Sequence, residues 1–223
     1  LRGRFVALYR DSDTQIDNVF DDTRVVMPSL TWAPTADTSV TGILLRQETD
    51  SDTGSQFVPV AGTLLPGPDG IALDPDVYAG EPGFNRFDTQ STQVTLLAEH
   101  RLRGDWYVNG TALWRDGEAD YHQAWPIFTG AGNSRYLNDI AGAEVATATT
   151  VPRSFYQADN TSEQRAVDLR LSGSFRTGAL EHELLVGAQY QNVETDNNVA
   201  YLYGGGALSG DFSFALDLAN PVY

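Results

Sequence analysis

The side chains of this sequence that are suited to chemistry are carboxylates, arginines, histidines and aromatic rings. The three histidines, His100, His122 and His182, are scattered and lack the HExxH spacing of a zinc site, so we predict no metal ligands. Cysteine is absent, which excludes disulfides, thiolate ligands and thiol nucleophiles. We find no GxSxG, no phosphate-binding P-loop and no GxGxxG after a strand. The sequence therefore does not predict an enzyme of these classes.

Acidic residues form two suggestive groups. Five aspartates lie close together near the start of the chain: Asp11, Asp13, Asp17, Asp21 and Asp22. They lack the glycine and the distal glutamate of an EF-hand loop, which favours a solvated acidic loop over a Ca²⁺ site. The pair Glu118 and Asp120 leaves a glycoside hydrolase open, a class that requires two converging carboxylates with perturbed pKa values.

Composition limits the possible partners. The chain has 14 basic residues, all arginine, against 30 acidic ones, which gives a formal charge of -16. This balance argues against a nucleic-acid partner, because phosphate binding needs a basic surface. A hydrophobic content of 41% argues against disorder. No apolar run approaches the roughly 20 residues of a membrane-spanning helix, whereas a barrel strand crosses with about 9–11 tilted residues.

The elements that must position these side chains are long alternating segments. Apolar and polar residues alternate with period 2, most clearly in the segment 163–176, and helical periodicity is weak. Pro28 within the second segment suggests a bulge or a local break in the ladder. The predicted strands are Leu1–Arg10, Arg24–Ala33, Thr38–Asp50, Gln90–Leu102, Trp106–Ala119, Glu163–Arg176 and Glu181–Thr195.

The connections between these segments alternate strictly between short and long. The short ones are Pro34–Asp37, Arg103–Asp105 and Thr177–Leu180, and the long ones are Asp11–Thr23, Ser51–Thr89, Asp120–Ser162 and Asp196 onward. Transmembrane barrels have tight periplasmic turns and long external loops, and their strands exceed the usual five to six residues of soluble ones. We therefore predict an all-β fold, an antiparallel up-and-down transmembrane β-barrel.

Residue parity along these strands agrees with a membrane barrel. Trp32, Trp106 and Phe175 lie beside the short turns, as expected of an interfacial aromatic girdle. Charged residues share the opposite, lumen-facing parity, where a solvated barrel interior is polar: Glu99, Arg101, Arg115, Asp168 and Arg170. The competing hypothesis is a soluble acidic β-rich binding module, whose apolar faces would pack inward.

Several segments resemble TonB-dependent ferric-siderophore receptors of the ferrichrome and hydroxamate type. The segments that carry the resemblance run in order along nearly the whole chain. They are Met27–Pro34 with Asp37–Thr41, Gly54–Pro66, Gly80–Asp88, Glu99–His100 followed by Trp106, Leu180–Gly187 and Asn220–Tyr223. The loop segments are the more specific ones, since barrel strands resemble one another in composition.

This resemblance implies a barrel of about 22 strands closed by an N-terminal plug. The whole range 1–223 would then be a partial barrel domain of about seven strands, the middle part of the barrel, without the plug and the C-terminal strands. The implied function is uptake of a ferric siderophore across the outer membrane of a Gram-negative bacterium, driven by TonB, which would bind through the missing N-terminal part. The implied partners are the siderophore, TonB and outer-membrane lipid. Cobalamin, haem or a sugar is the alternative cargo.

A ferric siderophore brings its own iron ligands, so the resemblance implies no cofactor and no protein metal ligand. The receptor needs aromatic walls against the organic shell and a few hydrogen-bond donors. The predicted ligand-binding residues in the long loops are Tyr78, Phe84, Arg86, Tyr121, Trp125 and Tyr136, drawn from a wider group that also includes Phe57, Phe128, Phe155 and Tyr156. For each of them the alternative is an anchor that packs inside its own loop.

Overall fold

The computed structural model describes residues 1–54, 57–127, 136, 147–202 and 214–223. Seven antiparallel strands form one sheet in the order β1-β2-β3-β4-β5-β7-β8, and β6 pairs with β9 in a two-stranded sheet. The strands are β1 (Arg2–Arg10), β2 (Asp21–Thr35), β3 (Thr38–Ser51), β4 (Arg86–Arg101), β5 (Tyr107–Pro126), β6 (Thr150–Val151), β7 (Arg153–Thr177), β8 (Leu180–Leu202) and β9 (Leu216–Asp217). A 3-10 turn, η1 (Pro68–Gly70), lies between β3 and β4.

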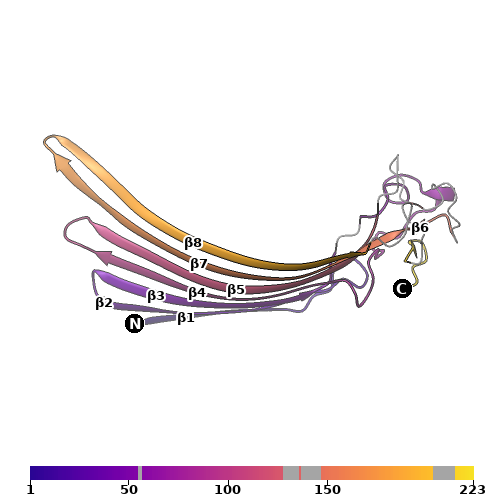
Figure 1. Ribbon diagram of the computed structural model, residues 1–223, viewed down its shortest axis with the longest axis horizontal. Helices are drawn as coiled ribbons and strands as arrows, with labels where there is room; N and C mark the ends of the chain where they lie inside the picture. Colours follow the sequence, from indigo (N-terminus) through magenta and orange to yellow (C-terminus); the bar gives the residue numbers. More distant parts are fainter. Residues whose placement is uncertain (55–56, 128–135, 137–146, 203–213) are drawn as a thin grey trace.

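Each strand of the large sheet pairs with the long strand that comes before or after it in the described sequence. The topology is therefore up-and-down. Figure 1 shows the short β2–β3, β4–β5 and β7–β8 hairpins at one end of the bowed sheet, and β6 at the other end, where the long connections lie. We call these the turn end and the loop end. The predicted alternation of short and long connections is confirmed. Among the described residues, no helix has the length and apolarity to cross a membrane.

The strand register separates an apolar face from a polar face. One cross-strand row on the apolar face runs through Leu30, Gly42, Leu96, Ala112, Val167 and Tyr190. The next row, on the opposite face, runs through Thr31, Thr41, Leu97, Thr111, Asp168 and Gln189. Apolar-face side chains stay open to the surroundings, with Leu96 47% and Leu169 56% exposed. The inward packing expected of a soluble module is therefore not found on the described apolar face.

Two local features of the sheet follow the sequence, one at the turn end and one in the middle of β2. Trp106 and Phe175 stack on the apolar face with ring centroids 6.5 Å apart, next to the hairpins predicted from the sequence. Pro28 keeps the register of β2 against β1, but β2–β3 pairing stops at Val26 and resumes at Ser29 without a shift. The structure thus has a local break at Pro28, and the register shift lies between Trp32 and Thr35.

The strands continue further toward the loop end than the sequence predicts. β7 begins at Arg153 instead of Glu163, and β8 ends at Leu202 instead of Thr195. The ladder between them remains regular through polar pairs such as Asp159 with Asn198 and Thr161 with Asp196. Backbone hydrogen bonds to β5 and β8 hold the added residues of β7 extended, and pairing with β7 holds those of β8, even where apolar alternation has ended.

Candidate functional site

A row of aromatic side chains crosses the polar face at the loop end. Phe87 of β4 lies 5.6 Å from Tyr121 of β5, and Tyr121 lies 5.6 Å from Tyr156 of β7, measured between ring centroids. Tyr156 then lies 4.5 Å from Tyr201 of β8, its direct partner across the ladder. Four adjacent strands therefore present one continuous aromatic wall, which we call the aromatic row: Phe87, Tyr121, Tyr156 and Tyr201.

The aromatic row combines open ring surface with fixed polar groups. Phe87 is 41% and Tyr201 56% exposed, so their rings can meet a ligand. The Tyr121 hydroxyl donates a hydrogen bond to Oε1 of Gln123. Rings supply apolar contact area, and phenol groups supply directional hydrogen bonds, which together suit an organic ligand with exposed oxygens.

The long connections fold over the loop end around a small core of their own, which we call the loop cap. Its core contains Leu73, Val77, Ala79, Tyr136, Val151, Leu216 and Leu218. Tyr136 is 1% exposed and donates a hydrogen bond to the Ala61 carbonyl oxygen at 2.7 Å. The pairing of β6 with β9 joins residues on either side of β7 and β8 within this cap. Segments far apart in the sequence are thus held together.

Tyr78 and Asp52 form a buried pair within the loop cap. The Tyr78 hydroxyl lies 2.8 and 2.9 Å from the two carboxylate oxygens of Asp52, and the tyrosine is fully buried. Burial raises the pKa of Asp52 to about 6, although the hydrogen bond from Tyr78 acts in the opposite direction. Burial and the Asp52 carboxylate raise the pKa of Tyr78. Tyr223 donates a hydrogen bond to the Tyr78 carbonyl oxygen at 2.7 Å, which ties the C-terminal segment to the pair.

Arg153, at the start of β7, connects three parts of the loop cap. The residue is 4% exposed. Its guanidinium donates to the Gly80 carbonyl oxygen, to the Glu81 carboxylate at 2.7 Å and to the Phe214 carbonyl oxygen at 2.9 Å. A planar group with several donors suits this task, because it can satisfy acceptors from different segments at once.

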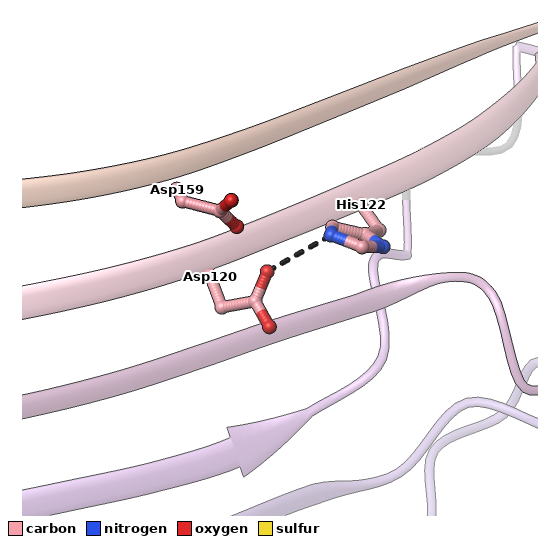
Figure 2. A group of neighbouring side chains, drawn as sticks. All are labelled: Asp120, His122 and Asp159. Carbon is pink, nitrogen blue, oxygen red and sulfur yellow. Dashed lines mark ion pairs between the residues drawn. The ribbon is translucent and has the colours of Figure 1, made fainter. Parts of the chain in front are cut away.

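Arg86, Asp120 and His122 form a polar cluster on the outward, apolar-face side of the loop end. The Arg86 Nη2 atom lies 2.6 Å from Oδ2 of Asp120 and 3.3 Å from Nε2 of His122. Asp159 of β7 lies beside Asp120 and His122, as Figure 2 shows. Phe84 packs against the rings of His122 and Phe155, each at 5.1 Å between centroids. Phe84 and Arg86 therefore belong to the outward side, and the aromatic row belongs to the polar face.

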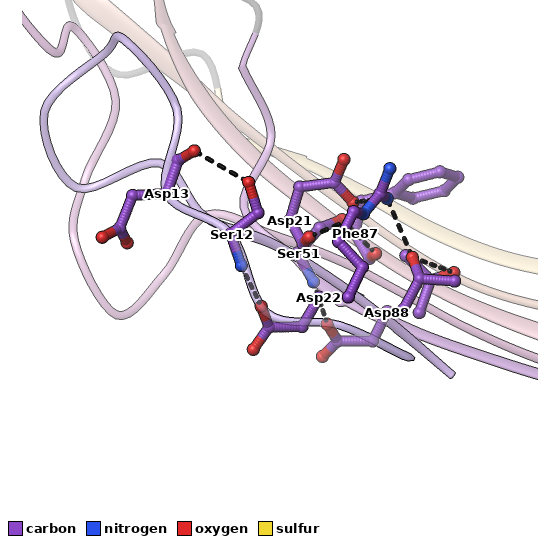
Figure 3. Close-up of polar contacts among 10 residues, drawn as sticks. Ser12, Asp13, Asp21, Asp22, Ser51, Phe87 and Asp88 are labelled. Carbon is purple, nitrogen blue, oxygen red and sulfur yellow. Dashed lines mark hydrogen bonds and ion pairs between the residues drawn. The ribbon is translucent and has the colours of Figure 1, made fainter. Parts of the chain in front are cut away.

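The aspartates near the start of the chain make local contacts at the same end of the sheet (Figure 3). Asp22 accepts a hydrogen bond from the Ser12 amide at 3.0 Å, and Asp21 forms an ion pair with Arg10 at 2.5 Å. Ser51 donates to the Phe87 carbonyl oxygen at 2.8 Å on the neighbouring strands. The contacts of Asp21 and Asp22 link the two ends of the β1–β2 connection, and the Ser51 contact links β3 to β4. That these aspartates form a solvated loop stays a prediction.

The six predicted ligand-binding residues divide into three groups. Tyr121 faces the polar side within the aromatic row. Phe84 and Arg86 lie on the outward side, and Tyr78 and Tyr136 are anchors inside the loop cap. Trp125 is half-buried near the end of β5, opposite Ser154. Phe128, from the wider group, lies outside the described residues.

Sequence reasoning placed Tyr121, Trp125 and Tyr156 in a loop, and the structure places all three in strands. It did not select Phe87 and Tyr201, which complete the aromatic row. Their signal is parity, since both fall on the polar-face parity of a strand near its loop end. That signal could be read only if β4 and β8 were extended by several residues beyond their apolar alternation.

Comparisons with known proteins agree with this architecture. No family model matches the chain. The chain is 26% identical, over 99% of its length, to the ferrioxamine B receptor of Salmonella typhimurium, and it covers 28% of that protein. It is 22% identical, over 98% of its length, to the ferrichrome outer membrane transporter/phage receptor of Escherichia coli, and covers 29% of it.

Solved structures give the same result for the fold. The ferric-catecholate import receptor Fiu of Escherichia coli matches 99% of the chain with a TM-score of 0.77 and 16% identity, and the chain covers 30% of it. The siderophore receptor PiuA of Acinetobacter baumannii matches 99% with a TM-score of 0.74 and 21% identity, and the chain covers 32% of it.

The described antiparallel up-and-down sheet therefore has the same fold as the matching part of these solved structures. Among individual proteins, the chain is similar along almost its whole length to the ferrioxamine B and ferrichrome receptors, which confirms the resemblance predicted from the sequence. The chain spans less than a third of the length of these two relatives. The proteins named are receptors and transporters, not enzymes.

Proposed function

We propose that this chain forms part of the wall of an outer-membrane receptor that takes up a ferric siderophore of the hydroxamate class, energised by TonB. The range 1–223 would be a partial barrel domain, to which other parts of the complete gene product add the plug and the remaining strands. The single observation that carries the proposal is the aromatic row, at the loop end of the polar face.

The two faces of the sheet support this assignment. The exposed apolar rows suit contact with lipid tails, because alternate residues of a transmembrane barrel face the hydrocarbon. The opposite face carries polar and charged side chains, including the ion pair of Arg170 with Asp168 at 2.7 Å. A ligand entering from the loop end would therefore pass the aromatic row before it reaches the polar interior.

The cargo assignment follows from chemistry and from the relatives. A siderophore shell of amide and hydroxamate oxygens around iron needs ring surfaces and hydrogen-bond donors, and Tyr121, Tyr156 and Tyr201 offer both. The relatives' names refer to ferrioxamine and ferrichrome, whereas nothing in the described residues favours cobalamin, haem or a sugar. Of the six residues predicted from the sequence, Tyr121 is the one that would contact the ligand directly.

The test uses the complete gene product that carries this chain, expressed in a strain without other siderophore receptors. We expect uptake of radioactive iron from ferrioxamine B or ferrichrome. Tyr156→Ala should weaken siderophore binding about tenfold or more, a loss of about 1.4 kcal/mol, because it removes the ring that joins Tyr121 to Tyr201. Tyr190→Ala is the matched control, since Tyr190 lies on the same sheet but on its apolar face.

Two results would contradict the proposal. If the unmodified protein reaches the outer membrane and takes up no ferric siderophore, the transport function is rejected. If uptake occurs and Tyr121→Ala, Tyr156→Ala and Tyr190→Ala all bind the siderophore equally well, the aromatic row is not the binding wall.

A further inference from the structure

Three metal-ligating side chains converge on the outward side of the loop end. Asp120 of β5 and Asp159 of β7 are direct partners across the ladder, and His122 lies two residues further along the same face of β5. One ligand atom from each of the three lies within 4.8 Å of the others. Figure 2 shows the Asp159 carboxylate directed toward Asp120 and His122. Two hydrogen-bonded strands thus fix the three positions, so little ordering is needed on binding.

The Asp120 carboxylate is already oriented as a ligand. Its Oδ2 atom is held by Arg86 at 2.6 Å. Its Oδ1 atom is buried and is paired with Nε2 of His122 at 3.0 Å. Carboxylates that bind metal ions are commonly fixed by a hydrogen bond on the other oxygen. Two ligand atoms about 3 Å apart can both bind one ion at the usual distances of about 2.0–2.2 Å.

Burial and charge also favour a cation here. The His122 side chain is only 12% exposed, and its ring packs against Phe84, which limits its rotation. Glu118 and Asp196 line the recess that also includes Asp120 and Asp159, so the surrounding field is negative. Arg86 neutralises part of that charge, and its 3.3 Å contact with His122 Nε2 must lengthen when that nitrogen binds a metal. An imidazole with two carboxylates suits a first-row transition metal better than Mg²⁺ or Ca²⁺.

We propose that Asp120, His122 and Asp159 form a binding site for a divalent first-row transition metal, with Zn²⁺ as the probe and Arg86 as the positioning residue. The site lies on the outward side of the sheet, away from the aromatic row, so it does not depend on the proposed uptake function. A bound ion would fasten β5 to β7 below the loop cap. Sequence reasoning predicted no metal ligands because sequence spacing does not show the β5–β7 register, which places Asp159 opposite Asp120 and near His122.

The test measures Zn²⁺ binding to the complete gene product in detergent by calorimetry, for the unmodified protein and for single variants. Asp159→Asn and His122→Gln should each weaken one Zn²⁺ site about tenfold or more, because each removes a ligand. Asp196→Asn is the matched control: it removes the same charge from the same recess without removing a ligand, so it should weaken the affinity much less than Asp159→Asn does. Bound Co²⁺ should change its visible absorption when His122 is replaced, since imidazole is a ligand.

Three outcomes would overturn the site. The first is Zn²⁺ binding that neither Asp159→Asn nor His122→Gln weakens. The second is an equal loss in Asp196→Asn and Asp159→Asn, which would indicate diffuse charge attraction. The third is displacement of Zn²⁺ by a modest excess of Mg²⁺, which would indicate carboxylates alone. Asp159 is exposed, so Asp159→Asn should fold normally. This variant therefore still tests the site if His122→Gln fails to fold.

Discussion

At the scale of single residues, the loop cap contains the buried pair Asp52 and Tyr78, and the protonation of Asp52 changes with pH. Asp52 lies just beyond β3, outside the sheet, and is 8% exposed. Burial disfavours the charged carboxylate, and its pKa rises from 3.8 to about 6. The folded cap therefore binds a proton more tightly than the unfolded segment does. The stabilisation from that proton is complete below about pH 3.8 and is lost as the pH rises through about 6.

Because the raised pKa of Asp52 makes the loop cap more stable at low pH, it gives a direct prediction for hydrogen exchange in the cap. Amide hydrogens of residues 76–79 should be better protected at pH 5 than at pH 7.5, after correction for the intrinsic exchange rate. Asp52→Asn should remove most of this difference, because the amide keeps an oxygen for the Tyr78 hydroxyl and does not titrate. Hydrogen exchange followed by mass spectrometry measures both proteins. Protection that increases with pH through 6 in the unmodified protein would be the opposite of this expectation.

At the scale of elements, the turn end depends on one close approach between a glycine and a ring. A Cβ atom added to Gly173 would lie 2.3 Å from the Trp106 ring, and that ring also stacks on Phe175. Gly173→Ala must therefore displace Trp106 from the β4–β5 turn. We expect a loss of about 1–3 kcal/mol in the free energy of unfolding, the usual cost of overpacking. Urea unfolding of the complete gene product in detergent, followed by tryptophan fluorescence, measures it.

Gly42→Ala is the matched control for this change. Gly42 lies on the same apolar face of the sheet, in β3, and no atom would come within 4 Å of an added Cβ. It should unfold at nearly the same urea concentration as the unmodified protein. Equal destabilisation by both substitutions would mean that the close contact with Trp106 does not control the effect.

The strands also show which part of the fold is visible in sequence. Alternation predicts the middle of each strand well, because one face is apolar and the other polar, as in β7 from Glu163 to Arg176. Beyond the apolar rows both faces are polar, and residues 153–162 look like a loop. They are extended because β5 and β8 supply backbone partners on both sides. Such pairing is a property of the neighbours and leaves no periodic signal in the segment itself.

The same limit explains the partial success with the candidate site. Tyr121 could be selected by residue type alone, but its neighbours Phe87 and Tyr201 come from other strands and require the register. Tyr78 and Tyr136 have the residue type expected of ligand contacts, yet they lie in the loop cap core, where ring and hydroxyl are both satisfied by the protein. Type indicates what a side chain can do, and only packing indicates whether a ligand can reach it.

At the scale of the whole molecule, the sheet is asymmetric from face to face and from end to end. Apolar rows cover one face through the middle of the strands, charged and polar side chains cover the other, and the loop cap lies at one end only. An apolar face of this size normally requires a partner layer or lipid. The described residues provide no second layer over it, which makes the apolar face the surface for the bilayer in the proposed receptor.

A pair of substitutions in β7 tests this orientation. Leu169 lies on the apolar face and is 56% exposed, whereas Ala166, three residues earlier in the same strand, lies on the polar face. Leu169→Arg should cost about 2–4 kcal/mol, because a guanidinium near the bilayer midplane is poorly solvated, and should reduce the fraction of protein assembled in the outer membrane. Ala166→Arg places the same group in a polar, solvated interior and should assemble nearly normally. Heat-resistant migration on gels reports the assembled fraction for each variant. Tolerance of Leu169→Arg together with loss of Ala166→Arg would reverse the two faces, and the aromatic row would then lie outside the barrel, where no imported ligand could reach it.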